Sequence, residues 1–379
     1  MKKTKILISI LSILLSGVLM FAAFSSVNRT SVTEADAKID GVKGRIYKFS
    51  EDIINRIYTP EESEEQNDFK STKVLLGGYP VGLKLYADGV VVVDTESVDT
   101  ENGDVDTAGN AGLQIGDVIK EINGIRVTTN KEVSQIMEQS NGVPLKLTVL
   151  RGKDVVYLDF TTAYSVSEGK YKAGIWIRDS SAGIGTVTFS MRDGYFAALG
   201  HAVCDIDTKQ VIPISQGETT DVSIVEYVKG KSGCAGELCG YLESDKTGEV
   251  LFNGDLGVYG KFQAPRQTTV YEIASAKEIK VGEASIFTTI ENGVIREYSI
   301  SITSINEDAE DNKHLTIKIT DDELINETGG IIQGMSGSPI VQNGKLVGAV
   351  THVFLNDPTG GYGILAQTML EKVNDISLN

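Results

Sequence analysis

Glycine interrupts the last 214 residues of this chain at short intervals, and this pattern constrains the possible folds strongly. Brief apolar runs at residues 174–189, 195–203, 248–262 and 277–305 are separated by glycine-containing turns. The chain has 40 glycines but only 7 prolines. Short strands separated by turns are typical of antiparallel barrels, and no helical pattern of similar strength precedes the C-terminus. The sequence therefore predicts a mainly β fold.

Length and charge limit the class of protein further. At about 150 residues per domain, 379 residues allow two or three domains. The net charge is −17, which disfavours a nucleic-acid binder because neutralising phosphates requires clustered Lys and Arg. Residues 51–106 contain fourteen acidic and four basic side chains. Their first part, 59–71, predicts a solvated linker, and residues 94–110 predict an acidic loop within a domain.

The N-terminus predicts export and membrane anchoring. Lys2, Lys3 and Lys5 precede nineteen uncharged residues, 6–24. This length suits one transmembrane helix, since crossing the hydrocarbon core takes about 20 apolar residues. The lysines favour the cytoplasmic side, so the remainder of the chain crosses the membrane. We expect an anchor at residues 1–27 and a linker at 28–71.

The segment after the linker shows strand and helix patterns. Residues 73–93, 111–127 and 144–160 are rich in β-branched side chains and broken by turn residues, which predicts strands. Residues 130–139 place Val133, Ile136 and Met137 on one helical face behind Thr129 or Asn130 as a cap.

The string AGLQIGDVI at residues 111–119, followed by Ile122-Asn123-Gly124, resembles the core signature of a PDZ domain. The resemblance implies a PDZ domain over residues 72–165 that captures a peptide C-terminus or another copy of this chain. The peptide would add as a strand beside residues 83–86, against the helix at 131–139. A spacer that binds nothing is the alternative, and Pro80 removes one donor from the implied loop. The implied carboxylate-binding residues are Leu76, Gly77, Gly78, Tyr79, Gly82 and Leu83.

The densest chemical signal lies at residues 329–353. Ser336 stands between Gly334 and Gly337 in a stretch that allows a sharp turn, so its hydroxyl can protrude while nearby N–H groups face a developing oxyanion. A strand, an Asn-Gly turn and a second strand follow. The whole pattern resembles the nucleophile segment of trypsin-like serine proteases. This resemblance implies a double β-barrel, an oxyanion hole at Gly334 and Ser336, and a substrate pocket at Thr351, His352 and Val353.

A serine nucleophile needs a base, and the chain has three histidines. His201 ends an apolar strand at a glycine and precedes Ser336, which makes it the candidate base. His314 lies in a highly charged loop and is expected at the surface, whereas His352 follows the nucleophile hairpin. The candidates for the carboxylate that orients the base are Asp205, Asp207, Asp321 and Asp322.

The strings LGHAVCDIDT and GGIIQGMSGSPIVQNGKLVGAVTHV, together with the PDZ-like domain and the anchor, resemble the stage IV sporulation B peptidases of endospore-forming bacteria. The resemblance implies a triad of His201, Asp321 and Ser336 in a serine peptidase domain at residues 166–379, with no metal or cofactor. It also implies an enzyme in the inner forespore membrane facing the intermembrane space. Such enzymes cleave themselves and then a regulatory membrane protein, which activates a late mother-cell sigma factor. Residues 59–71 are the expected self-cleavage region.

Two other functions fit parts of the sequence. A non-catalytic PDZ scaffold would keep the fold without the chemistry, and a general extracytoplasmic quality-control protease would degrade unfolded proteins. Cys204, Cys234 and Cys239 are too few for a disulfide framework, although a local bridge between the last two is compatible with their spacing. A buried thiol is expected at Cys204.

Overall fold

The computed structural model describes residues 73–378 except 265 and 292. The predicted anchor at 1–27 and the linker at 28–71, with the expected self-cleavage region, lie outside the described residues. Within the described part, no helix combines the length and apolar character needed to cross a membrane.

Six antiparallel strands close into a first barrel. They pair in the circuit β2–β11–β12–β15–β14–β13 and back to β2. Its interior contains Leu83, Val187, Phe196 and Phe262, all 5% exposed or less. The strands are β2 (Pro80–Thr95), β11 (Ile175–Ser190), β12 (Tyr195–Ala198), β13 (Ile214–Val228), β14 (Glu237–Gly254) and β15 (Gly257–Phe262).

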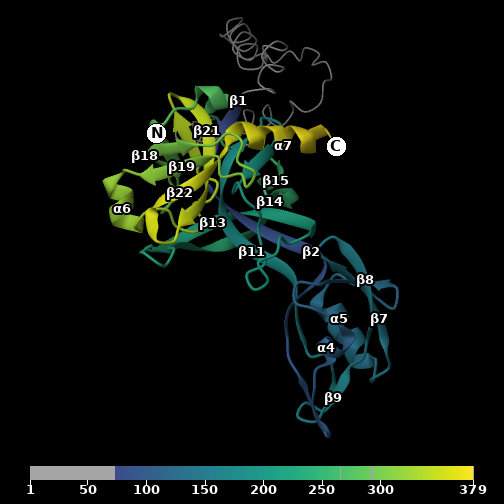
Figure 1. Cartoon of the computed structure of the whole chain (residues 1–379). Helices are drawn as coiled ribbons and strands as arrows, with labels where there is room; N and C mark the ends of the chain where they lie inside the picture. Colours follow the sequence, from purple (N-terminus) through teal and green to yellow (C-terminus); the bar gives the residue numbers. More distant parts are fainter. Residues whose placement is uncertain (1–72, 265, 292, 379) are drawn as a thin grey trace, which may run out of the picture. The chain divides into compact units, whose positions relative to one another are not determined.

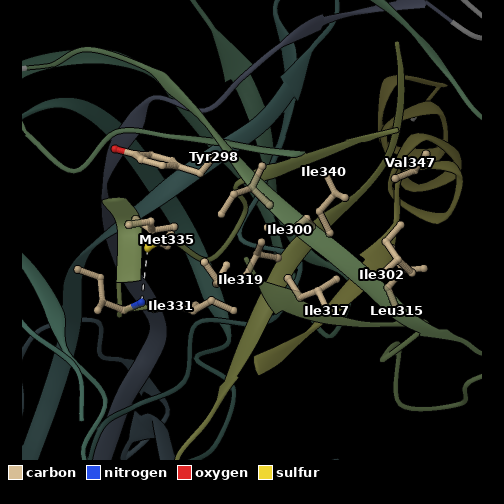
Figure 2. Packing of buried hydrophobic residues seen from close by; sticks show 14 of the residues in the cluster. Tyr298, Ile300, Ile302, Leu315, Ile317, Ile319, Ile331, Met335, Ile340 and Val347 are labelled. Carbon is tan, nitrogen blue, oxygen red and sulfur yellow. Dashed lines mark hydrogen bonds between the residues drawn. The ribbon is translucent and has the colours of Figure 1, made fainter. Parts of the chain in front are cut away.

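A second antiparallel barrel closes through the circuit β17–β18–β19–β22–β21–β20 and back to β17. Figure 2 shows its apolar core, which includes Ile300, Ile317, Ile340 and Met335. Helices α6 (Asp322–Thr328) and α7 (Ala366–Leu378) follow β19 and β22. The strands are β17 (Gly282–Thr288), β18 (Arg296–Ile305), β19 (Leu315–Ile319), β20 (Pro339–Gln342), β21 (Lys345–Phe354) and β22 (Asp357–Leu365).

Two short strands connect the barrels. β1 (Lys73–Leu76) pairs with β11 and also with β16 (Val270–Ile273). β16 in turn pairs in parallel with β21, and the short 3-10 helix Ala276–Glu278 leads on to β17. The prediction of a mainly β fold with two barrels is therefore confirmed in the described part of the chain.

A smaller sheet with the strand order β11–β2–β5–β7–β8 forms the domain predicted to be a PDZ domain. Its core includes Val90, Ile119, Val133 and Phe160. The predicted helix is confirmed as α5 (Asn130–Gln139). It begins after Thr129, because Thr129 and Glu132 form a reciprocal capping box there. The other elements are β5 (Val118–Ile122), β6 (Ile125–Arg126), β7 (Leu145–Arg151), β8 (Asp154–Phe160), β9 (Ala163–Ser165), β10 (Lys170–Lys172) and α4 (Thr107–Ala111).

The acidic segment at residues 94–110 is more ordered than the predicted loop. It contains a hairpin of β3 (Val98–Thr100) and β4 (Gly103–Val105), and its last residues begin α4. Asp106 caps α4 by accepting a hydrogen bond from the Gly109 N–H. One of the acidic side chains, that of Asp106, therefore serves as a helix cap, a role that composition does not indicate.

The strand pairing changes the predicted domain boundary. β2 pairs with β13 of the first barrel as far as Ala87, and with β5 of the PDZ sheet from Val90. β2 and β11 lie side by side through both domains (Figure 1). The first part of β2 thus belongs to the first barrel, although the predicted 72–165 domain includes it, and the PDZ domain is inserted where the chain passes from β2 to β11. Alternation predicted the strands correctly but does not identify their partners.

Candidate active site

Ser336 lies in a tight turn before β20. Gly334 and Gly337 on either side have φ angles of +97° and +96°, which favour glycine. A Cβ at Gly337 would approach the Thr186 carbonyl oxygen to 1.9 Å, so glycine is also needed there for space. The turn is closed by a 2.9 Å hydrogen bond from the Ser338 N–H to the Met335 carbonyl. The side chain of Ser336 stays partly exposed.

The N–H groups of Gly334 and Ser336 are available as donors. Neither donates a hydrogen bond to any residue described by the structure. The N–H of Met335 between them donates instead to Ile332, at 3.1 Å. Two free N–H groups beside a nucleophile are the arrangement that stabilises a tetrahedral oxyanion.

The first barrel holds the nucleophile turn through two threonines of β11. The Thr186 N–H donates to the carbonyl of Ser336 at 2.9 Å, and its hydroxyl donates to the carbonyl of Gly334 at 2.7 Å. The Thr188 hydroxyl donates to the carbonyl of Gly337 at 2.8 Å. The nucleophile turn, which precedes β20 of the second barrel, is therefore fixed by a strand of the first barrel.

His201 reaches the same region from the first barrel. Leu199 and Gly200 have φ angles of +65° and +71°, so the chain turns sharply between the end of β12 and His201. Gly200 packs against Thr351, where a Cβ would meet the threonine methyl at 2.8 Å. Thr351 is the residue whose carbonyl accepts the Ser336 hydroxyl, at 2.7 Å. Histidine and serine are thus neighbours, although no direct hydrogen bond joins them in the described structure.

The surroundings of His201 suit a general base. Its Nδ1 lies 2.8 Å from the Ala202 carbonyl oxygen. Because a carbonyl only accepts, Nδ1 carries the proton and Nε2 is left as the acceptor. Burial lowers the pKa of His201, so the ring is neutral at pH 7.

His201 and His352 line a cavity of about 920 Å³ whose wall comes from both barrels. Their ring centroids are 5.0 Å apart. Partial burial lowers the pKa of His352, and neighbouring His201 lowers it further. Ser336 is not part of the cavity wall, since its hydroxyl is directed to Thr351. The wall also includes residues 181–184 of β11 and the carboxylates Asp205, Asp255 and Asp311.

Asp321 is not placed against His201. Its two carboxylate oxygens accept hydrogen bonds from the N–H groups of Leu324 at 3.1 Å and Ser299 at 3.2 Å. These bonds cap α6, whose first residue is Asp322, and hold it against β18. The orienting role of Asp321 stays a prediction.

Asp205 and Asp207, the other candidates near the base, are occupied by Arg178 of β11. Asp255 was missed by sequence reasoning. It occupies the turn between β14 and β15, and β15 pairs with β12, the strand that leads to His201. No ion-pair partner of Asp255 is found in the described part of the chain, and it lines the cavity with His201. The signal was present in the sequence, since Asn253-Gly254-Asp255 marks a hairpin turn.

The predicted carboxylate-binding loop is not a binding loop in this structure. The N–H groups of Leu76, Gly77 and Gly78 donate to Thr269, Thr188 and Val187, at 3.0, 2.9 and 2.7 Å. Each N–H supplies one hydrogen bond, so none remains for a terminal carboxylate. The remaining predicted residues Tyr79, Gly82 and Leu83 are buried in the first barrel, where Gly82 pairs with both β11 and β13.

Other predicted residues have mixed positions. Thr351 is 3% exposed, and its hydroxyl has no partner in the described structure. Val353 packs against the second-barrel core. His314 is 6% exposed, so the prediction that it lies at the surface was wrong. It is not part of the cavity wall. Cys204 is exposed rather than buried, and the three described cysteines are free.

The two barrels, the serine turn and the adjacent histidine define a serine endopeptidase that carries a PDZ domain. The family model described as SpoIVB peptidase S55 matches residues 169–370, and a PDZ-domain model matches residues 107–151. Because the first match spans more than half of the chain, the protein belongs to the SpoIVB peptidase S55 family. The prediction of a serine endopeptidase of this family is therefore confirmed.

Solved structures resemble the chain in parts. The PDZ domain of an SdrC-like protein from Listeria monocytogenes is 25% identical, with a TM-score of 0.20, over 24% of this chain and 87% of that one. The HtrA-type protease AlgW with a decapeptide is 12% identical, with a TM-score of 0.33, over 53% and 55%. The Rv3671c protease from M. tuberculosis, in its active form, is 15% identical, with a TM-score of 0.32, over 51% and 74%. No curated protein matches the chain.

Proposed function

We propose that this protein is a membrane-anchored, self-processing serine endopeptidase that signals across the intermembrane space during sporulation. It would cleave a regulatory membrane protein and so lead to activation of a late mother-cell sigma factor. Membership of the SpoIVB peptidase S55 family supports this role. The pattern of Lys2 to Phe24 supports the anchor in the forespore inner membrane, and the acidic residues 59–71 support a site of self-cleavage.

The chemistry rests on one observation: Thr351 lies beside both Ser336 and His201. Its carbonyl accepts the hydrogen bond of the Ser336 hydroxyl, and its methyl group packs against Gly200, which directly precedes His201. The Ser336 hydroxyl first turns from the Thr351 carbonyl towards Nε2 of His201. His201 then removes the hydroxyl proton as the oxygen attacks a peptide carbonyl. The N–H groups of Gly334 and Ser336 donate to the oxyanion.

The tetrahedral intermediate then collapses to the acyl-enzyme. His201 gives its proton to the leaving amine, and water next attacks the acyl group with His201 again as base. The released carbonyl of Thr351 and the residues after it can pair with the extended substrate. This assigns the predicted pocket residues Thr351, His352 and Val353 to the acyl side of the cleaved bond.

Two carboxylates are candidates for orienting His201. The family resemblance implies Asp321, which caps α6 in this structure. The cavity implies Asp255, which lines the same wall as His201. The orienting group holds the imidazole and stabilises its cation, so substitution of the correct residue lowers activity without moving the serine.

A serine-reactive fluorophosphonate tests the proposed chemistry directly. The full chain in detergent should be labelled on Ser336, and Ser336→Ala should lose labelling and self-cleavage while its melting temperature stays unchanged. Ser338→Ala is the matched control, because this buried hydroxyl donates to Met335 and is not exposed to reagent. Absence of labelling in the wild-type chain would favour the non-catalytic scaffold. Digestion of unfolded casein at many bonds would favour a quality-control protease.

A further inference from the structure

Among the residues that the structure describes, β11 has a long edge without a strand partner. One edge pairs with β2 from Ile175 to Thr186, whereas the other pairs with β12 only from Val187 onwards. Between residues 175 and 185, the backbone of β11 makes no hydrogen bond to the described part of the chain beyond the β2 ladder. This open edge is therefore about ten residues long, or about 33 Å at 3.3 Å per residue.

The open edge connects two functional regions. At its PDZ end it lies beside α5, where the N–H of Asn130 donates to the Asp179 carboxylate at 2.8 Å. At its barrel end, residues 181–184 line the cavity with His201. Thr186, two residues further along β11, donates a hydrogen bond from its N–H to the carbonyl of Ser336. One strand thus contacts α5 through Asp179 and the nucleophile turn through Thr186.

The side chains along this edge do not protect it from pairing. Proteins usually blunt free edges with Lys, Pro or unpaired charges. Residues 175–184 contain no Lys or Pro, and both of their charged side chains have partners. The guanidinium of Arg178 pairs with Asp205 and Asp207, and the carboxylate of Asp179 accepts from the Asn130 N–H. Residues 180–183 are small, Ser-Ser-Ala-Gly, so another backbone can approach closely. Register shifts near Trp176 and Arg178 separate a PDZ stretch from a cavity stretch.

We infer that the open edge of β11 binds the segment of a protein substrate that follows the cleaved bond, as an added antiparallel strand. An antiparallel strand beside β11 runs from the Ser336 end towards Ile175, so it leads from the cleaved bond to the PDZ domain. A free C-terminus about ten residues beyond the cleaved bond would arrive beside α5. This inference rests on the proposed function, since it names the substrate segment of that same site.

The substrate backbone supplies most of this recognition. Each further residue pair adds main-chain hydrogen bonds to the ladder, so we expect six further pairs to strengthen binding roughly tenfold, which corresponds to about 1.4 kcal/mol. The edge accordingly selects an extended, unfolded segment in which the C-terminus lies at a suitable number of residues beyond the cleaved bond. Side-chain identity along the segment matters less than length.

The only tryptophan of the chain, Trp176, reports on binding because it lies on this edge and is 57% exposed. The probes are peptides of alternating Thr and Val with a free C-terminus, four or ten residues long. Titrated into full-length Ser336→Ala in detergent, the ten-residue peptide should bind roughly tenfold more tightly than the four-residue peptide. Equal affinities, or no change in tryptophan emission with either peptide, would overturn the inference.

N-methylation provides a second test on the same peptides. Alternate N–H groups of a strand point to opposite edges, so only one of two complementary N-methylation patterns blocks pairing with β11. One pattern should abolish the length effect and the other should preserve it. Identical affinities for the two patterns would overturn the inference.

A pair of neighbouring proline substitutions tests the protein side. Ala182→Pro and Gly183→Pro remove adjacent N–H groups, one facing β2 and one facing the open edge. The variant that keeps the wild-type melting temperature should lose the advantage of the ten-residue peptide, and retention of that advantage would count against the inference. Fluorophosphonate labelling of Ser336 in the wild-type chain reports the proposed protease chemistry separately, so the two failures are distinguishable.

Discussion

The N–H of Thr186 donates a 2.9 Å hydrogen bond to the carbonyl oxygen of Ser336, which joins the strand shared with the PDZ domain to the nucleophile turn. β11 carries Ile175 in the PDZ sheet and Thr186 beside the serine. A peptide bound at the PDZ end therefore contacts the same strand that fixes the nucleophile.

The acid limit of activity should lie below the usual histidine range. The base must be neutral to accept the Ser336 proton, and burial lowers the pKa of His201 from its usual 6.5. A lower pKa keeps the ring neutral in more acidic solution, so the rate should be lost only at a pH below 6.5. The rate of fluorophosphonate labelling of the wild-type chain, measured from pH 4 to 8, checks this. A midpoint at or above pH 6.5 would contradict the prediction.

Asp255→Asn should lower kcat/KM by about 10²–10⁴, because an amide does not stabilise the imidazolium. Its melting temperature should not change, since Asp255 is exposed in a turn. Asp321→Asn is the matched comparison, because asparagine also caps helices well and keeps α6 stable. Self-cleavage rates and thermal unfolding of both variants distinguish the two residues. Loss of activity in Asp321→Asn alone would assign the orienting role to Asp321.

Arg178→Gln should loosen the segment after His201. The guanidinium pairs with Asp205, which is 3% exposed, and with Asp207. Removing the partner of a buried carboxylate costs about 2 kcal/mol of unfolding free energy. Urea unfolding should show this loss, together with slower labelling of Ser336. Asp207→Asn is the control, because its carboxylate is about half exposed and should contribute under about 1 kcal/mol.

Gly337→Ala should be much more destabilising than Gly344→Ala. Both glycines have positive φ, at +96° and +75°, so each alanine costs about 1–2 kcal/mol in backbone strain. At Gly337 the added Cβ would also lie 1.9 Å from the Thr186 carbonyl, whereas at Gly344 nothing lies within 4 Å. Comparing the urea midpoints of the two variants isolates the steric effect. Equal midpoints would contradict the prediction, because they would show that the nucleophile turn and β11 move apart at little cost in free energy.

Local patterns predicted the local structure well. The Thr129 cap and apolar spacing correctly gave α5, because a helix is specified by contacts three and four residues apart. The Asn343-Gly344 turn and its two flanking strands are likewise present as β20 and β21. Ser336 and His201 were chosen from chemistry and chain order, and the fold brings their segments together.

Long-range pairing decided what the sequence left open. Alternating residues at 73–93 predict a buried strand in any sheet. They do not reveal that the N–H groups of Gly77 and Gly78 donate to β11 and that the N–H of Leu76 donates to Thr269, just before β16. The resemblance placed a carboxylate near Ser336 by counting, but Asp321 caps a helix while Asp255 lies on the cavity wall.

The sequence by itself determined the strands, the serine turn and the candidate base, because side-chain periodicity and turn chemistry are local properties, and its resemblance to known families implied the two barrels and the PDZ domain. Only the tertiary structure decided that β2 and β11 serve both domains and that β11 keeps an open edge between Ile175 and Gly185. The physical reason is that a strand has two edges, and which of them finds a partner depends on residues far away in the chain.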